Sequence, residues 1–548
     1  MSGRVTAKKK SKSRSVIHLP GTAGCVFLAL LFAFLSACLI TRRISPRGAA
    51  GFYSAFSVHI FFLMLFPLGA AQALRSLVAW RYAGGFFRNA ARLGVAAAVN
   101  AAVYVGIVAL FWLPFAQRIA ARLLMGPGNE MALLWMFPLF VGDTVLLLLC
   151  AYIDGIDDRW TTARAFLLRQ FTGFVFLFIF SDMSNSTGEQ TAKLLHYDGI
   201  RYIYGAGSAA ILLIPGTLAA IVFCILKLRS GRMRREEMLG RDSNKKHESP
   251  SGLLYSRCFP LCFSMLGFFS IIYAALVIDS AAAEGEWLIR SYQWGMFGGI
   301  SCIFGFLPMA LVFLLQYSAA EQVTTGAERR NLTEVRLKCQ ALNTQGGLIL
   351  SFFAVFNAVM APQLAQGIMG VDSAMAVRLL RLGSIVLMIC GFALMSGMQI
   401  LMLKRERKAI LHCILALPPA GLVYYLFRPA LSIYAMIPAS ALFFGLILAQ
   451  NLRQLWRMIR YQVHPAESVL LPLGICLAGG AGILLLGLLF GLFLPALVVL
   501  LICGILYFFF CFIAACRFRL ITAYGLRSLP FGEYLIRLGL SLKQIKEN

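Results

Sequence analysis

The sequence predicts an all-α polytopic membrane protein. Of its 548 residues, 60% are hydrophobic and only 13% are charged, and the mean hydropathy is +0.78. Soluble domains are about 45–50% apolar and about 25% charged. A helix of about 20 apolar residues spans a bilayer, and stretches of that kind recur along this chain. Their continuous apolar character excludes a β-barrel, whose strands alternate in polarity.

The apolar stretches divide into about 14 predicted transmembrane helices, in the following order. They are 21–41, 52–78, 93–116, 131–153, 165–182, 203–227, 255–280, 291–318, 343–369, 376–402, 409–427, 430–451, 468–490 and 493–516. An even number of transmembrane helices places both termini on the same side of the membrane. Lysine and arginine favour the cytoplasmic side of a membrane. Most of the 50 basic residues fall in the two tails and the even-numbered connections, which predicts cytoplasmic N- and C-termini.

The connections predict the domain organisation. A basic tail, 1–20, precedes the first span, and a long charged segment, 228–254, separates six spans from eight. Charge-dense polar segments of this kind are typical linkers. We therefore expect an N-terminal six-helix bundle (21–227), a C-terminal six-helix bundle (255–451), two additional helices (452–516) and a cytoplasmic C-terminal tail (517–548). Paired bundles are typical of transporters that hold their substrate between two halves, which predicts two pseudo-symmetric bundles around a central cavity.

The net charge of +27 would suggest nucleic acid in a soluble protein. In a membrane protein it indicates topology and contact with membrane lipids, so we expect no nucleic-acid partner. The 14 cysteines are scattered within apolar runs, which predicts neither a disulfide framework nor a metal site. Catalytic sequence motifs are absent, so neither an enzyme nor a cofactor is expected. Acidic residues at 154, 157 and 158 are interpreted as a solvated turn.

Polar side chains inside spans are the best candidates for function, because they are costly in lipid and usually face a cavity or a partner. Asp143 lies near the middle of the fourth span and must be protonated or paired. The other candidates within or near spans are Gln72, Arg75, Asp279, Arg290, Gln293 and Gln399. Arg75, Asp279 and Arg290 lie near predicted interfaces, where they are expected to reach the lipid head groups.

Several segments carry a family resemblance, in order along the chain. They include SPRGAAGFYSAFSVHIFFL (45–63), LLCAYIDGIDDRWTTARAFLLRQ (148–170), CFPLCFSMLGFFSIIYAALVIDS (258–280) and WGMFGGISCIFGFLPMALVFLLQYSAAEQVTTG (294–326). Together they resemble the multidrug/oligosaccharidyl-lipid/polysaccharide (MOP) flippase superfamily. The nearest branch is the stage V sporulation protein B-like polysaccharide biosynthesis proteins, relatives of the lipid II flippase. Asp279 falls on an aspartate of the family pattern.

The resemblance implies a MATE/MOP-like fold and a flippase of the bacterial cytoplasmic membrane. Its cargo would be a polyprenyl-phosphate-linked oligosaccharide or cell-envelope precursor, moved by alternating access. Under this hypothesis the phosphate partners are Arg42, Arg43, Arg75 and Arg169, and Asp143 is the coupling or cavity acid, with H+ or Na+ as the coupling ion. The chain departs from the lipid II flippase in having no arginine within 25–40 or 302–307, which argues against lipid II as its cargo.

Three other functions are open on the sequence. A cation-coupled multidrug exporter of the same fold would need acids deep in the N-terminal half, and Asp143 is one. A membrane glycosyltransferase or polymer ligase would need a large outer domain, which the spacing of the spans does not leave room for. A non-transporting scaffold for envelope assembly would use the basic tails to bind envelope-synthesis proteins or anionic lipid.

Overall fold

The computed structural model describes residues 19–123, 130–156, 158–196, 199–231, 249–280, 287–521 and 536–537. Within these ranges all regular structure is helical, and no strand occurs. The predicted basic tail (1–20), linker (228–254) and C-terminal tail (517–548) lie mostly outside the described residues. The predicted helical class is confirmed for the part of the chain that the structure describes.

Six helices form the N-terminal half. They are α1 (Leu19–Leu65), α2 (Pro67–Ala83), α3 (Phe87–Leu123), α4 (Glu130–Gly155), α5 (Arg159–Leu195) and α6 (Gly199–Ser230). Local sequence explains two of the boundaries. Pro67 starts α2, where its missing N–H is not needed. Asp158 caps α5 by accepting a hydrogen bond from the Thr161 N–H at 3.2 Å, which satisfies one of the free donors of the first turn.

The C-terminal half is more interrupted. It consists of α8 (Pro250–Ser280), α9 (Trp287–Met296), η2 (Phe297–Cys302), α10 (Ile303–Glu328), α11 (Leu332–Val359), α12 (Ala361–Gln363), η3 (Leu364–Ile368), α13 (Ala374–Met402), α14 (Glu406–Leu431), η4 (Ser432–Ala435), α15 (Met436–Ile459), η5 (Ala466–Leu470), α16 (Leu471–Gly491) and α17 (Ala496–Arg517). Three of the short elements, η2, η3 and η5, are π-helical. Such segments are rare and concentrate at functional sites.

Thirteen helical stretches among the described residues are long and apolar enough to cross a membrane. One of them, Glu406–Ile459, is 54 residues long and contains both α14 and α15. At 1.5 Å per residue this stretch is more than twice the thickness of a bilayer core. Ser432, with φ of 53°, breaks the helix between α14 and α15, which pack against each other. The two predicted spans 409–427 and 430–451 are therefore separate helices.

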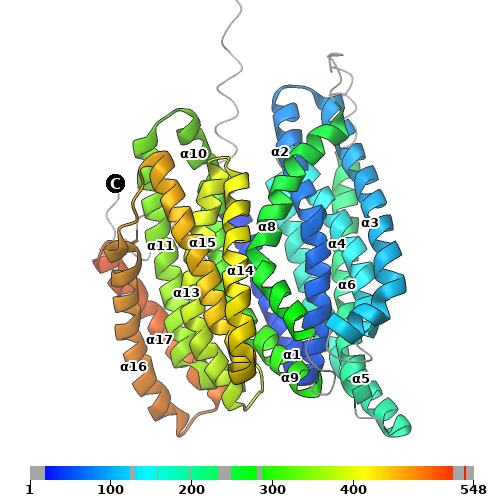
Figure 1. Ribbon diagram of the computed structural model, residues 1–548, viewed down its shortest axis with the longest axis vertical. Helices are drawn as coiled ribbons and strands as arrows, with labels where there is room; N and C mark the ends of the chain where they lie inside the picture. Colours follow the sequence, from blue (N-terminus) through cyan, green and yellow to red (C-terminus); the bar gives the residue numbers. More distant parts are fainter. Residues whose placement is uncertain are drawn as a thin grey trace, which may run out of the picture.

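The helices gather into two bundles (Figure 1). One is built mainly by contacts of α5 with α6, α1 with α5 and α4 with α6, and the other by contacts among α11, α13, α14 and α15. The last two helices extend the second bundle, because α16 packs on α11 and α17 packs on α16. In Figure 1 the ribbons of the two bundles lie apart at the upper end and come together at the lower end.

Helix α8 crosses from one bundle to the other (Figure 1). Near its beginning it packs on α2, where a Cβ on Gly69 would lie 2.2 Å from the Cys262 Sγ. Further along it packs on α14, where a Cβ on Gly267 would lie 2.9 Å from the Cys413 Cβ. Glycine at both contacts lets the helices approach more closely than larger residues would allow. Any movement of α8 would therefore also displace α2 in one bundle and α14 in the other.

Helix α1 doubles back on itself. It contains two apolar spans, one ending at Ile44 and the next beginning at Arg47. The Tyr53 hydroxyl donates a hydrogen bond to the Ala37 carbonyl at 2.9 Å, although the two residues are 16 positions apart. In a straight helix 16 residues span about 24 Å, so this bond requires a reversal between them. The reversal lies at the lower end of Figure 1, where α1 meets the C-terminal bundle.

Candidate functional site

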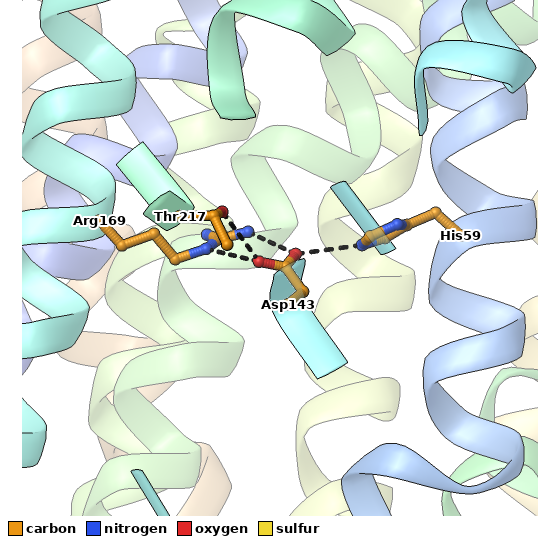
Figure 2. Close-up of polar contacts among 4 residues, drawn as sticks. All are labelled: His59, Asp143, Arg169 and Thr217. Atoms are coloured by element: carbon orange, nitrogen blue, oxygen red, sulfur yellow. Dashed lines mark hydrogen bonds and ion pairs between the residues drawn. The ribbon is translucent and has the colours of Figure 1, made fainter. Parts of the chain in front are cut away.

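Four polar side chains meet inside the N-terminal bundle (Figure 2). Asp143, midway along α4, accepts two hydrogen bonds from Arg169 of α5, one from Nε at 2.9 Å and one from Nη2 at 2.6 Å. The Thr217 hydroxyl of α6 donates to the Asp143 Oδ1 at 3.1 Å. On the other side, the His59 Nε2 of α1 lies 3.2 Å from the Asp143 Oδ2. We call these four residues the Asp143 cluster.

The Asp143 cluster is shielded from solvent. The side chains of His59, Asp143 and Arg169 are 1%, 7% and 18% exposed. Isolated charges at such depth are very costly, whereas a bidentate guanidinium–carboxylate pair offsets much of that cost. Asp143 is therefore held as a paired carboxylate, one of the two states expected of it. Asp143 and Arg169 were separate candidates on the sequence, and the structure brings them together.

His59 and Thr217 were missed by the sequence analysis. The six histidines are far apart in sequence, so none was considered as a partner for Asp143. The usable signal was that His59 is an ionisable residue within an apolar run, SVHIFFLML. Its ring packs flat on Phe56, with centroids 5.5 Å apart, and edge-on to Phe140 at 6.2 Å.

A second cluster surrounds Asp279 at the end of α8. Arg428 of α14 forms an ion pair with its Oδ1, and the Trp294 indole N–H donates to its Oδ2 at 2.6 Å. Arg290 donates to the Asp279 backbone carbonyl at 2.9 Å. The expectation that Asp279 reaches lipid head groups is wrong, because Asp279 is only 6% exposed and bonds within the protein. The same expectation for Arg290, which is partly exposed, stays a prediction. This cluster joins α8, α9 and α14.

Arg75 of α2 contacts residues of both bundles. Its Nε lies 2.5 Å from the Asp154 Oδ2 of α4, and its guanidinium carbon lies 5.0 Å from the centre of the Tyr317 ring of α10. Arg75 is therefore paired within the protein, and its contact with lipid head groups stays a prediction. The solvated-turn interpretation is also wrong for Asp154, whose side chain is 14% exposed. Asp157 lies outside the described residues. Nearby, Gln72 has a buried Oε1 for which the described residues provide no hydrogen bond.

The two arginines near the α1 reversal have different partners. Arg42 donates from Nη1 to the Gly367 carbonyl in η3, at 3.2 Å, and so contacts the C-terminal bundle. Arg43 forms an ion pair with Asp182 of α5, within its own bundle. Both are partly accessible at their positions. Only Arg42 therefore bridges the two halves.

The two remaining candidates lie in the C-terminal half. Gln293 accepts a hydrogen bond from the Ser432 hydroxyl at 2.6 Å. Gln399 is fully buried and donates to the Asn343 Oδ1 at 2.9 Å, in a network that continues from Asn343 to the Tyr461 hydroxyl at 2.7 Å. Neither residue is near the Asp143 cluster in the contacts of the described chain. Within that part of the chain, no group of three His, Cys, Asp or Glu side chains is placed to hold a metal.

Comparison with known proteins identifies the fold. No protein-family model and no curated protein matches the sequence. An inward-facing multidrug resistance MATE family transporter of the MOP superfamily aligns with a TM-score of 0.57 at 14% identity, over 79% of this chain and 94% of that one. The lipid II flippase MurJ, in an inward closed conformation, aligns with a TM-score of 0.56 at 11% identity, over 90% and 98%. A MOP superfamily transporter from Pyrococcus furiosus aligns at 0.53 and 13%, over 82% and 96%.

The chain is thus a multi-pass membrane protein with a two-bundle helical architecture. More particularly, it has the fold of the MOP superfamily, which the MATE transporters and the lipid II flippase share with it. The superfamily resemblance inferred from sequence is confirmed at the level of the fold. The narrower branch, that of the stage V sporulation protein B-like proteins, stays a prediction.

Proposed function

We propose that this protein is an alternating-access flippase, not an enzyme, and that it moves a polyprenyl-phosphate-linked oligosaccharide or cell-envelope precursor across the bacterial cytoplasmic membrane. The observation that carries the proposal is the extent of the structural likeness. The lipid II flippase aligns over 90% of this chain, whereas the MATE transporters named above and the Pyrococcus furiosus protein align over 79–82%. The cytoplasmic placement of both termini belongs to the same proposal.

The physics of the transport step supports the same choice. A saccharide with one or two phosphates does not cross hydrocarbon unaided, because removing water from its charges is too costly. Polar and basic groups between two bundles would replace that water while the lipid tail stays in the membrane. Arg42 and Arg75 each contact the opposite bundle. Cations at those contacts suit an anionic head group better than a cationic drug.

The test is the fate of lipid-linked saccharides in cells depleted of the protein. We expect one species to accumulate, and an impermeant lectin or glycosidase should find it in the inner leaflet. Wild-type protein should restore the outer-leaflet pool, and an Asp143→Asn variant should not. If the pool of lipid-linked saccharides is unchanged and the depleted cells become more sensitive to cationic dyes, the multidrug exporter is favoured over the flippase. No change in either would favour the scaffold for envelope assembly.

For the coupling ion, we propose a proton held by the Asp143 cluster in preference to Na+. Both oxygens of Asp143 are already bonded to Arg169, whereas His59 is in contact with the same carboxylate. An imidazole ring can accept and release a proton, whereas a guanidinium stays protonated in proteins. We therefore assign His59 as the residue of this cluster that carries the coupling proton.

The His59→Phe variant should weaken the response of transport to an imposed proton gradient. Phenylalanine keeps the ring packing against Phe56 and Phe140 but cannot take up a proton. We expect folding stability to change by no more than about 1 kcal/mol, because the ring volume is nearly conserved. The measurement is the initial transport rate in proteoliposomes with and without an imposed proton gradient. His464→Gln, at an exposed loop position, is the matched control. A wild-type response to the gradient in His59→Phe would contradict the proposal that a proton is the coupling ion.

A further inference from the structure

Two consecutive side chains near the α1 reversal form hydrogen bonds to the C-terminal bundle. Thr41 donates from its hydroxyl to the Gly299 carbonyl at 3.1 Å, and Arg42 donates to the Gly367 carbonyl at 3.2 Å. Gly299 lies in η2 and Gly367 lies in η3. Both acceptors are thus backbone carbonyls of π-helical segments. The α1 reversal, close in sequence to both donors, lies at the lower end of Figure 1, where the bundles meet.

We propose that Thr41 and Arg42 form a releasable latch that closes this end of the interface, and that a phosphate-bearing head group opens it by taking Arg42 from the Gly367 carbonyl. The latch itself depends only on the contacts just described. The identity of the opening ligand rests on the proposed function. The contact of Arg75 with the Tyr317 ring also joins the two bundles, but it involves neither Thr41 nor Arg42 and is not part of the latch.

Thr41 has two alternative acceptors, which is what a reversible contact needs. It is fully buried, and besides the Gly299 carbonyl it lies 3.3 Å from the Tyr53 hydroxyl. Tyr53 uses its own proton on the Ala37 carbonyl, so its oxygen is available as an acceptor. When the bundles separate, Thr41 keeps a partner within α1. Release therefore leaves no unsatisfied hydroxyl on α1, which would otherwise oppose opening.

Arg42 differs from Thr41 because it is exposed and charged. Its bond to Gly367 joins a cation to a neutral acceptor. A phosphate offers the same guanidinium two ionised oxygens, so that two N–H groups bind in parallel and both partners carry charge, which a single bond to a neutral carbonyl does not provide. A phosphate that reaches this end of the interface would therefore displace the carbonyl. A lipid head group and a free diphosphate share this chemistry.

The close fit at Gly299 is specific to the latch. A Cβ there would lie 3.1 Å from the Thr41 Oγ1 and 3.2 Å from the Tyr53 Cε2, both tighter than ordinary contact. At Gly305, in the same stretch of chain, a Cβ would meet only the Leu387 Cδ1, at 3.9 Å. Gly299→Ala should therefore loosen the latch from the opposite bundle, and Gly305→Ala should not.

A native cysteine reports on this interface. Cys38 of α1 is 4% exposed and packs within the core of the C-terminal half, with residues such as Ile271 and Trp294. Opening of the lower end would expose it to an impermeant maleimide. Cys150, 2% exposed within the N-terminal bundle, would react only if that bundle unfolded. Labelling of each cysteine is measured by peptide mass spectrometry on the full-length protein in nanodiscs of zwitterionic lipid.

We expect Thr41→Val/Arg42→Gln to raise the Cys38 labelling rate about tenfold, the ratio that corresponds to the loss of two ordinary hydrogen bonds. Gly299→Ala should raise it in the same direction. Arg43→Gln is the matched control, because it removes the neighbouring charge but only a contact within the N-terminal bundle. Wild-type labelling of Cys38 in both the double variant and Gly299→Ala overturns the latch, and equal gains in Arg43→Gln or at Cys150 do the same.

The second arm tests the opening ligand with inorganic pyrophosphate and with a polyprenyl diphosphate placed in the nanodisc. Either probe should raise Cys38 labelling several-fold in the wild-type protein and leave Arg42→Gln unchanged. A response to the lipid probe alone assigns the head group as the source. No response to either probe overturns the exchange at Arg42 while the latch stands. Loss of saccharide flipping in the cellular assay is a separate readout, so failure of the proposed function is distinguishable from failure of the latch.

Discussion

Replacing Arg169 by methionine should lower the free energy of unfolding by about 3–5 kcal/mol, because it leaves the buried Asp143 carboxylate without its cation. Asp143 is 7% exposed, and Arg169 supplies two of its hydrogen bonds. Asp143→Leu should be costly for the converse reason, since it leaves a guanidinium that is 18% exposed without an anion. The measurement is unfolding in mixed micelles titrated with sodium dodecyl sulfate.

The double variant Asp143→Leu/Arg169→Met completes a double-mutant cycle with the two single variants and is its most informative member. Apolar pairs of similar volume often replace a buried ion pair at little cost, so we expect the double variant to recover to within about 1 kcal/mol of the wild-type stability. Transport should nevertheless be lost in all three variants. A non-additive stability cycle with transport still absent separates a functional charge pair from a structural one. If the stable double variant still transported its substrate, the Asp143 cluster would have a structural role only.

The helices were predictable because hydropathy is a local property of the chain. Each apolar stretch must span a bilayer, so its length and position are visible in the sequence without any contact. Asp143 was predictable for the same reason, since a carboxylate in an apolar run is conspicuous. The structure shows that the break between the spans 409–427 and 430–451 consists only of Ser432, with a positive φ, and the short η4 that it begins.

The interaction partners of the candidate functional residues were much less predictable from the sequence than the candidates themselves. Thr217 is 74 residues from Asp143, and the histidine that contacts the same carboxylate lies on the first helix. Polar groups near predicted interfaces were expected to reach the head groups, yet Arg75 and Asp279 are paired within the protein. A polar side chain near the end of a span can reach the lipid head groups or pair within the protein. Only the packing of the neighbouring helices decides between these two arrangements. The carbonyls that accept from Thr41 and Arg42 have no side-chain signature at all.

Replacing Gly216 by alanine should be among the most damaging small substitutions in the N-terminal half. A Cβ at this position of α6 would lie 2.3 Å from the Arg169 carbonyl oxygen and 2.9 Å from the Gly173 backbone nitrogen. Both are backbone atoms of α5, so no flexible side chain can move aside. The two helices would have to separate, and overpacking of this kind typically costs about 1–3 kcal/mol. Thermal unfolding followed by intrinsic fluorescence measures the loss.

The same substitution should also impair transport, because the atoms displaced belong to the residue that holds Asp143. Moving the Arg169 backbone away from α6 lengthens its reach to a carboxylate on α4, and Thr217 beside Gly216 also bonds to that carboxylate. Gly207→Ala is the matched control on α6, since its Cβ would meet the nearest atoms of Met131 at an ordinary 3.7 Å. Wild-type stability in Gly216→Ala would contradict the close α5–α6 contact. Lost stability with an unchanged transport rate per folded molecule would instead separate that contact from the Asp143 cluster.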